Sequence, residues 1–493
     1  MLPPPQRRSL YVVQWSISMS SKNPLKSFRR ISATSKSFIG NSAIYFVGST
    51  LSKLIGFLLL PLYTTLISPS DYGYYDLTIT YVTVVAVALF FDLWISVMRF
   101  MHDEKNENDK ASATLSGFII FTGSTFAYLS LVFFLSTYVE IQYVWLIAAY
   151  GLLSNLATMY GFIARGYKKS SAFVISGVLA TTVNALTAIL LLAILKLDFS
   201  SLYIAAILGF TVQVAYLEFK VHVLKRAIGA KLNKKLTKNI LIHTLPLAVN
   251  SAAFWLLTGY NRVIINTEMG VFANGIYAIA AKFVLAVTLI TSVFNFAWQD
   301  ILFTKAAKNE ISVFYSKSSN LYILFLLVGG SLLLPTFNIV FELITDSSYY
   351  SAKAIIPLLV ISALFGAYVV FQGSIFHSIK KTSVIFYSML AASLVNVLLC
   401  ALLINLFGLN GATLATIIGL CICVVIRMYM LRNLAHHRFE PFNALFGFLL
   451  VGSVLAYLYL DTAWNGTYLA VVVLVCLVLS KKLYTTYIEE AKN

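Results

Sequence analysis

The chain has 493 residues, of which 59% are hydrophobic and only 11% are charged. Soluble domains carry roughly 25% charged residues, because a surface that faces water needs them. The composition therefore excludes an ordinary soluble protein and predicts an all-α integral membrane protein.

The formal net charge is +17, from 36 Lys and Arg against 19 Asp and Glu. In a soluble protein such a balance would indicate nucleic-acid binding. Here the basic residues lie between apolar segments rather than on one face. We therefore expect them to set membrane topology and to contact lipid headgroups, and we expect no nucleic-acid partner.

The chain begins with a polar, basic tail over residues 1–37. This tail lacks the apolar core and the cleavage site of a signal peptide, so we expect none. We predict that the tail is cytoplasmic and disordered. Translation could start at Met1 or at Met19.

About fourteen apolar segments follow the tail. A helix of about 20 apolar residues crosses about 30 Å of hydrocarbon, and each segment comes close to that length or exceeds it. We predict spans at 38–66, 75–97, 113–136, 141–164, 172–196, 201–224, 240–265, 275–298, 318–343, 354–378, 382–406, 409–430, 442–460 and 464–481.

The segments between the spans alternate in charge. With a cytoplasmic N-terminus, the tail and the loops on its side hold 31 Lys and Arg, whereas the opposite loops hold only Lys196 and Lys353. This asymmetry predicts that both termini are cytoplasmic. No loop exceeds about 20 residues. An extramembrane catalytic domain would need more, so we do not expect an enzyme.

Two motifs recur along the chain and predict an internal duplication. Lys168-Lys169, Asn184 and Leu197 return as Lys380-Lys381, Asn396 and Leu409, always 212 residues later. The run 71–75 resembles 273–277 at an offset of 202. Six spans separate the equivalents, so the two halves share one orientation and form parallel lobes around a central cavity.

The tail over residues 1–37 is the first of five parts of the chain, and the duplication defines the other four. We predict a first lobe over 38–224, a basic cytoplasmic linker over 225–239 and a second lobe over 240–431. Residues 432–493 carry the last two spans and a cytoplasmic C-terminus.

Several cations lie at membrane depth, where a charge costs about 2.5–3.5 kcal/mol and usually faces protein or water. Lys53, Arg262 and Lys282 lie at mid or outer depth, and no carboxylate is expected level with them. Arg99 and Arg165 lie near the inner ends of their spans. We predict that these five residues line a cationic cavity for an anionic group. The alternative is that they reach the interface or pair with structural acids.

Three further polar residues lie within the spans. Asp92 is a candidate for carrying a coupling proton or cation, or for a structural pair. Asn184 and Asn396 are amides that join helices by hydrogen bonds or serve coupling. The four cysteines show no disulfide or zinc spacing, and we expect neither a metal nor another cofactor.

The order of several motifs resembles that of the Wzx-type polysaccharide (O-antigen) flippases of the multidrug/oligosaccharidyl-lipid/polysaccharide exporter superfamily. The matching residues are Gly48, Lys53, Pro61-Leu-Tyr63, Ser68-Pro-x-Asp-Tyr-Gly73, Leu245-Pro, Trp255, Asn261-Arg262, Gly275-Ile-Tyr277, Lys282, Lys380-Lys381, Asn396 and Phe407-Gly-Leu-Asn-Gly-Ala412. The family often has Asp where this chain has Asn261, which predicts an Arg262 freer to meet an anion.

The resemblance implies two pseudo-symmetric, MATE-like lobes of six helices plus two C-terminal helices. It also implies a flippase that moves an undecaprenyl-pyrophosphate-linked oligosaccharide across the bacterial inner membrane by alternating access. The product would be a surface polysaccharide such as O-antigen, capsule or exopolysaccharide. Membrane lipids and assembly proteins such as a polysaccharide polymerase are the expected partners.

Three other functions remain open. A cation-coupled multidrug exporter or a lipid II flippase would share the fold. A membrane glycan polymerase or ligase is disfavoured, because the chain has no long external loop.

Overall fold

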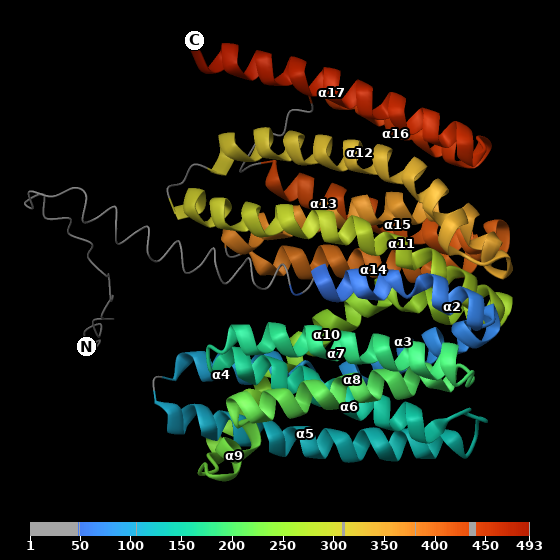
Figure 1. Cartoon of the computed structure of the whole chain (residues 1–493). Helices are drawn as coiled ribbons and strands as arrows, with labels where there is room; N and C mark the ends of the chain where they lie inside the picture. Colours follow the sequence, from blue (N-terminus) through green and yellow to red (C-terminus); the bar gives the residue numbers. More distant parts are fainter. Residues whose placement is uncertain are drawn as a thin grey trace, which may run out of the picture.

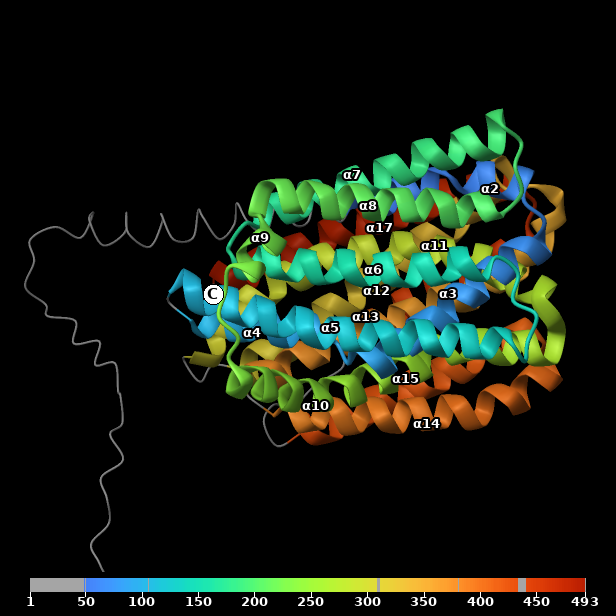
Figure 2. The ribbon, with the colours of Figure 1, turned by 90° about the horizontal axis from the view of Figure 1, so that it is seen from below.

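The computed structural model describes residues 48, 50–104, 106–307, 311–379, 381–432 and 440–492. The predicted basic tail and the loop 433–439 lie outside the described residues. Every regular element in the described residues is a helix, and the helices run side by side along the long direction of one bundle (Figures 1 and 2).

The helices have the following bounds: α2 (Leu60–Leu66), α3 (Pro69–Phe90), α4 (Leu93–Asp103), α5 (Glu107–Ser136), α6 (Val144–Gly166), α7 (Ser170–Ala188), η1 (Ile189–Ile194), α8 (Ser200–Val221), α9 (Val223–Ile228), α10 (Lys234–Thr258), α11 (Tyr260–Ala307), α12 (Ile311–Ile344), η2 (Ser347–Ile355), α13 (Ile356–Ser378), α14 (Thr382–Phe407), α15 (Leu409–Leu431), α16 (Pro441–Tyr459) and α17 (Thr462–Lys492).

Within the described residues, 11 helical runs are long and apolar enough to cross a membrane. One of them, Lys234–Ser292, has 59 residues and contains the seventh and eighth predicted spans, which are separated by non-helical backbone at Gly270. Two shorter apolar helices, Thr50–Leu66 and Thr462–Val478, match the first and last predicted spans. The chain is an all-α, multi-pass membrane protein, consistent with about fourteen spans.

The prediction of one continuous helix over 75–97 was wrong. Helix α3 ends at Phe90, and α4 begins at Leu93. Between them, Phe91 and Asp92 adopt left-handed backbone with φ of 54° and 53°. Side chains other than glycine rarely adopt this conformation, so tertiary contacts must hold the break. One of these contacts is a hydrogen bond from the Ser251 hydroxyl of α10 to the Asp92 carboxylate.

Lys169, before the fifth span, and Lys381, before the eleventh, have the same backbone conformation and equivalent hydrogen bonds. The Lys169 amide donates to the Ala164 carbonyl at 2.9 Å, and the Lys381 amide donates to the Phe376 carbonyl at 2.9 Å. Lys169 has φ −96° and ψ 53°, whereas Lys381 has φ −99° and ψ 56°. Both pairs keep the offset of 212 residues that the sequence showed.

The following helices also pack in the same way. A Cβ added to Gly209 would lie 2.6 Å from the Ala180 carbonyl oxygen, and one added to Gly419 would lie 2.6 Å from that of Ala392. These contacts join α7 to α8 and α14 to α15, and the two alanines are again 212 residues apart. Two pseudo-symmetric lobes are therefore confirmed, and α16 and α17 pack outside the second lobe against α12.

The lobes meet where α3 crosses α11. A Cβ on Gly275 would lie 1.8 Å from the Pro69 carbonyl oxygen, and one on Gly73 would lie 2.0 Å from that of Val271. The Asn274 amide donates to the Gly73 carbonyl at 2.8 Å. Gly73 and Gly275 are the equivalent residues of the second repeat, so the pseudo-symmetry axis passes close to this crossing. The charge count predicts that this end of the bundle is the outer one, and we call it the predicted outer end.

Helix α10 contacts both lobes. Near its start it packs on α4 and α5, where Thr244 donates to Ser96 at 3.0 Å and Thr237 to Ser116 at 2.9 Å. Further along it packs on α14, where the Ser393 hydroxyl donates to the Ala253 carbonyl at 2.6 Å. The sequence predicts a second lobe from residue 240, inside α10, whereas the contacts of this helix are divided between the two halves.

We predict that Gly275→Ala destabilises the protein, because the added methyl group has no space at the α3–α11 crossing. Overpacking of this kind costs about 1–3 kcal/mol. Thermal unfolding of the purified protein, followed by intrinsic fluorescence, should show a lower Tm.

Gly366→Ala in α13 is the matched control, since nothing lies within 4 Å of its added Cβ. Alanine also has the better helix propensity there, so the control should keep or slightly raise the Tm. Equal melting temperatures for the two variants would show that the lobes are not in close contact at Gly275.

Candidate functional site: an ion pair and tyrosine hydroxyls within the membrane

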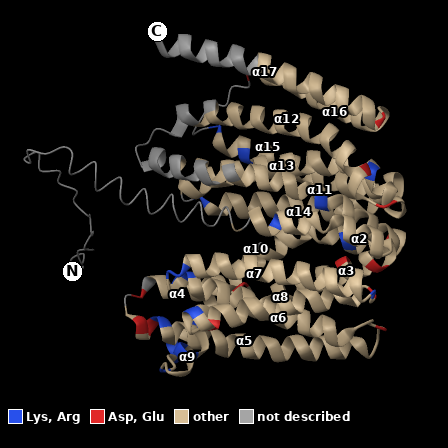
Figure 3. Cartoon of the chain, in the orientation of Figure 1, with Lys and Arg blue, Asp and Glu red and all other residues tan. Residues whose placement is uncertain are grey.

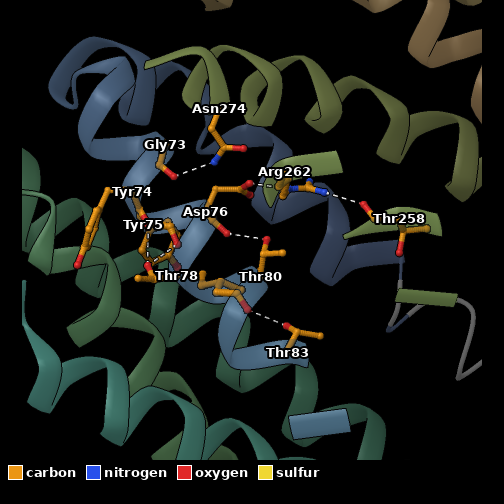
Figure 4. A network of polar contacts seen from close by, with 11 residues as sticks. Gly73, Tyr74, Tyr75, Asp76, Thr78, Thr80, Thr83, Thr258, Arg262 and Asn274 are labelled. Atoms are coloured by element: carbon orange, nitrogen blue, oxygen red, sulfur yellow. Dashed lines mark hydrogen bonds and ion pairs between the residues drawn. The ribbon is translucent and has the colours of Figure 1, made fainter. Parts of the chain in front are cut away.

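An ion pair joins the two lobes one turn below the glycine crossing. The Arg262 Nε of α11 lies 2.6 Å from the Asp76 Oδ2 of α3 (Figure 4). Arg262 also donates from Nη1 to the Thr258 carbonyl at 3.2 Å, and its guanidinium carbon lies 5.8 Å from the centre of the Tyr277 ring. The two charged side chains are 22% and 19% exposed, so the pair is largely shielded from solvent.

This pair corrects two expectations. The sequence indicated no carboxylate level with Arg262, and Asn261 suggested that Arg262 would be free. Asp76 supplies the missing carboxylate, because the crossing of α3 with α11 brings residues from the two halves together.

Asn261 points instead into a network of amides. Its Nδ2 donates to the Ala412 carbonyl at 3.0 Å and to the Thr416 hydroxyl at 2.7 Å, and it accepts from Asn396 at 3.0 Å. These bonds tie α11 to α14 and α15. They favour the structural alternative for Asn396, whereas its repeat equivalent Asn184 makes no side-chain hydrogen bond to the described residues.

Lys53 and Lys282 are the two other cations that the sequence placed at depth. Both are half-buried, and neither makes a hydrogen bond or an ion pair with the described part of the chain. Their helices touch, since the rings of Phe57 and Phe283 pack edge to face at 5.7 Å. The Lys282 ammonium also acts electrostatically on the Tyr63 hydroxyl. Two ammonium groups therefore lie in the span region without a described counter-charge.

A row of tyrosines runs from Lys282 past the ion pair into the first lobe. Tyr63, Tyr72, Tyr75, Tyr203 and Tyr150 follow one another with ring centres 6.1, 6.1, 4.9 and 6.3 Å apart. Tyr203 shares a hydrogen bond with Thr78. The hydroxyls of the other four make no hydrogen bond to the described residues. We call these five residues the tyrosine row. In the sequence, only the repeated motif at 71–75 marked a part of it.

The remaining predicted residues lie apart from the ion pair. Asp92 is buried at the α3–α4 break and accepts from Ser251. Arg99 is exposed on α4, and the Arg165 guanidinium lies 5.0 Å from the Phe162 ring and 5.6 Å from the Phe173 ring. Lys and Arg gather at the end of the bundle near α4 and α9 (Figure 3). The structure thus links Lys282 and Arg262 through Tyr63 and Tyr72 and puts Lys53 on a helix that contacts that of Lys282, whereas Arg99 and Arg165 lie away from these groups.

One cation was misplaced by the charge count. Arg427, near the end of the predicted span 409–430 and included in the count of 31 inner-side cations, is 1% exposed within α15. Its guanidinium donates to the Ser388 hydroxyl at 2.9 Å and to the carbonyls of Val369 and Ile385. It joins α13, α14 and α15, and one of the 31 predicted inner-side cations is therefore buried in the second lobe.

These groups suit binding rather than bond-breaking. Unpaired ammonium groups in a poorly hydrated region attract an anion, and tyrosine hydroxyls donate and accept hydrogen bonds. Within the described residues, no group of three His, Cys, Asp or Glu is placed to hold a metal ion.

Solved structures with the same fold are transporters. The chain is similar to the lipid II flippase MurJ in an inward closed conformation, with 16% identity, a TM-score of 0.68 and coverage of 90% of this chain and all of that one. It is also similar to an inward-facing multidrug resistance transporter of the MATE family, within the MOP superfamily. That match has 12% identity and a TM-score of 0.64, and it covers 78% of this chain and 94% of the other. At these identities the likeness shows the fold alone.

A curated relative works in glycan synthesis. The capsular polysaccharide biosynthesis protein CapF of Staphylococcus aureus is 23% identical over 407 residues, which cover 80% of this chain and all of CapF. The family model described as polysaccharide biosynthesis protein matches residues 38–303, more than half of the chain. The chain belongs to this polysaccharide biosynthesis protein family.

Proposed function

We propose that the protein is a flippase for an oligosaccharide linked to undecaprenyl pyrophosphate, in the bacterial inner membrane and with both termini cytoplasmic. The observation that carries this proposal is the pair of half-buried ammonium groups, Lys53 and Lys282, which lack a described counter-charge and lie on helices that contact each other through Phe57 and Phe283. Family membership and the relative CapF support a role in surface polysaccharide synthesis.

The chemistry of such a cargo matches the site. A pyrophosphate cannot enter the membrane without cations, and Lys53 and Lys282 would supply them at depth. The hydroxyls of the tyrosine row would bond to sugar hydroxyls, while the isoprenoid tail stays in lipid. Arg99 and Arg165, near the predicted inner end, are candidates for the first contact with the pyrophosphate.

The contact between α3 and α11 suggests how access alternates. The Gly73–Gly275 crossing and the Asp76–Arg262 pair hold the lobes together at the predicted outer end. Cargo would enter from the inner end, and its release would require Asp76 and Arg262 to separate as the lobes rock. For cargo to drive this change, it must bind more tightly to the state in which the lobes have parted at the outer end than to the state in which they are joined there.

The other transport functions fit less well. A multidrug exporter for cationic drugs would need acidic groups in its path, but the two half-buried charges without a described partner, Lys53 and Lys282, are basic. A lipid II flippase has a similar anionic cargo and remains the closest alternative. We expect assembly proteins such as a polysaccharide polymerase to use the product, and we assign the chain no enzymatic step.

We predict that Lys53→Gln and Lys282→Gln each lower surface polysaccharide at least tenfold, because the pyrophosphate loses a cation where hydration cannot replace it. A loss of about 1.4 kcal/mol of cargo binding accounts for a tenfold effect. Immunoblotting of surface glycan, normalised to the membrane level of each variant, measures it. Lipid-linked units should accumulate inside the cell.

Lys53→Arg and Lys282→Arg keep the charge and should retain part of the activity. Lys231→Gln, which neutralises an exposed lysine of the basic linker, is the matched control. Normal surface glycan in both glutamine variants would rule out the cationic path.

We predict that Asp76 and Arg262 are energetically coupled by about 1–3 kcal/mol, since the pair is close and mostly shielded from solvent. A double-mutant cycle with Asp76→Asn and Arg262→Gln, read by thermal or denaturant unfolding, measures this coupling. Each single variant leaves one partner unpaired, so the double variant should lose less stability than the sum of the two.

The exposed pair Arg226–Glu107 provides the comparison. Its nitrogen–oxygen distance is 2.7 Å, but its side chains are 37% and 62% exposed. Such a pair contributes roughly 0.2–1 kcal/mol. An Asp76–Arg262 coupling no larger than that of Arg226–Glu107 would argue against a role in closing the outer end.

A further inference from the structure

A pocket of about 600 Å³ lies at the predicted outer end of the second lobe, and it shares no lining residue with the ion pair or the tyrosine row. The end of α12, η2 and the connection from α16 to α17 form its walls. Its volume is within the range of roughly 300–1,000 Å³ typical of small-molecule sites. The lining includes Glu342, Tyr350, Lys353, Tyr457, Tyr459 and Asp461.

The Glu342 carboxylate has a fixed orientation in this pocket. Lys353 donates to it at 2.5 Å and Tyr350 at 3.2 Å, and the Thr462 hydroxyl donates to its other oxygen. A carboxylate has about four acceptor sites, so at least one remains for a ligand hydroxyl. The three donors come from η2 and α17. Their bonds to Glu342 therefore join the walls of the pocket without a ligand.

Tyr457 has a hydroxyl that lacks a partner. The residue is 2% exposed, and its buried hydroxyl makes no hydrogen bond to the described chain. It lies within the electrostatic reach of Glu342. Buried polar groups are nearly always bonded, so an unpaired hydroxyl in the lining of a pocket is available to bond to a ligand there.

The open side of the pocket carries aromatic rings. Tyr459 is 79% exposed and Tyr350 is 50% exposed. Exposed rings of this kind pack on the C–H faces of sugar rings, while nearby carboxylates accept from the sugar hydroxyls. Among the lining residues, Glu342 and Asp461 outweigh the single cation Lys353, so phosphate groups and acidic sugars are disfavoured.

We propose that this pocket binds a neutral or amino-bearing saccharide at the outer face of the protein. This inference rests on the proposed function in one respect. It assumes that the saccharide that reaches the pocket is the translocated glycan. Tyr457 supplies a hydrogen bond, Tyr459 and Tyr350 supply ring contacts, and Glu342 accepts from a hydroxyl or an ammonium group. Such a site would hold the glycan after translocation, before the next enzyme takes it.

The test uses the full chain in phosphatidylcholine nanodiscs. The probe is the oligosaccharide released by mild acid from the lipid-linked intermediates of the source cells, titrated by saturation-transfer NMR. Tyr457→Phe removes one hydrogen bond and should raise the Kd about fivefold. Tyr459→Ser should raise it by at least as much. Because the Tyr457 hydroxyl has no described partner, Tyr457→Phe should leave the Tm unchanged.

Tyr138→Ser is the matched control, since Tyr138 is 74% exposed beyond the end of α5 in the other lobe. It should bind the probe like the wild type. Wild-type affinity in both Tyr457→Phe and Tyr459→Ser, or no binding by the wild type, would overturn the proposal. So would equal displacement of the probe by glycerophosphoethanolamine, which would show a lipid-headgroup site.

The two proposals can fail separately. Lys53→Gln and Lys282→Gln should bind the free oligosaccharide normally, because they lie outside the pocket. If these variants transport normally while Tyr457→Phe weakens binding, the saccharide pocket stands and the cationic path falls. If they lose transport while Tyr457→Phe binds normally, the opposite holds.

Discussion

The close approach of Gly73 to Gly275 is the contact on which the arrangement of the lobes depends. No side chain larger than hydrogen fits there, since an added Cβ would lie about 2 Å from a backbone oxygen on either helix. The approach brings Asp76 within reach of Arg262, and it places the tyrosine row beside them. One crossing therefore determines both the closed end of the bundle and the composition of its polar interior.

The polar interior contains two kinds of charge. Arg262 has a carboxylate partner on the other lobe, so its charge is already compensated and its bond must break for the lobes to part. Lys53 and Lys282 have no described partner, so their charges remain to be compensated by something that enters. From this division we propose that the arginine holds the lobes together and that the two lysines bind an anionic cargo.

Much of the fold could be predicted because its signals are local. The length of apolar segments determines where helices cross the membrane, and a constant offset between Lys-Lys and Asn pairs revealed the duplication. The structure shows that Lys169 and Lys381 share one backbone conformation and equivalent hydrogen bonds, from the Lys169 amide to the Ala164 carbonyl and from the Lys381 amide to the Phe376 carbonyl. By contrast, nothing in the dipeptide Phe91-Asp92 predicts a break, because neither residue favours left-handed backbone strongly and the contacts that hold it come from α10.

The candidate site was only partly predictable for the same reason. Depth along a helix identified Lys53, Arg262 and Lys282 as unusual, but the partner of Arg262 comes from 186 residues earlier in the chain. Arg427 was counted among the inner-side cations because it lies near the end of an apolar segment, yet neighbouring helices enclose it. The outer pocket needs Glu342 and Thr462 to meet, and no local pattern connects positions 120 residues apart.

Transport by the purified protein in vesicles tests the central claim most directly. The lipid-linked oligosaccharide of the source cells is placed in the inner leaflet of proteoliposomes, and its exposure to an impermeant sugar-oxidising reagent outside is followed over time. A flippase should speed this exposure well above that of protein-free vesicles, and a cross-link that holds α3 to α11 should stop it. Exposure at the rate of protein-free vesicles, or a rate unchanged by the cross-link, would contradict a flippase that opens at this crossing.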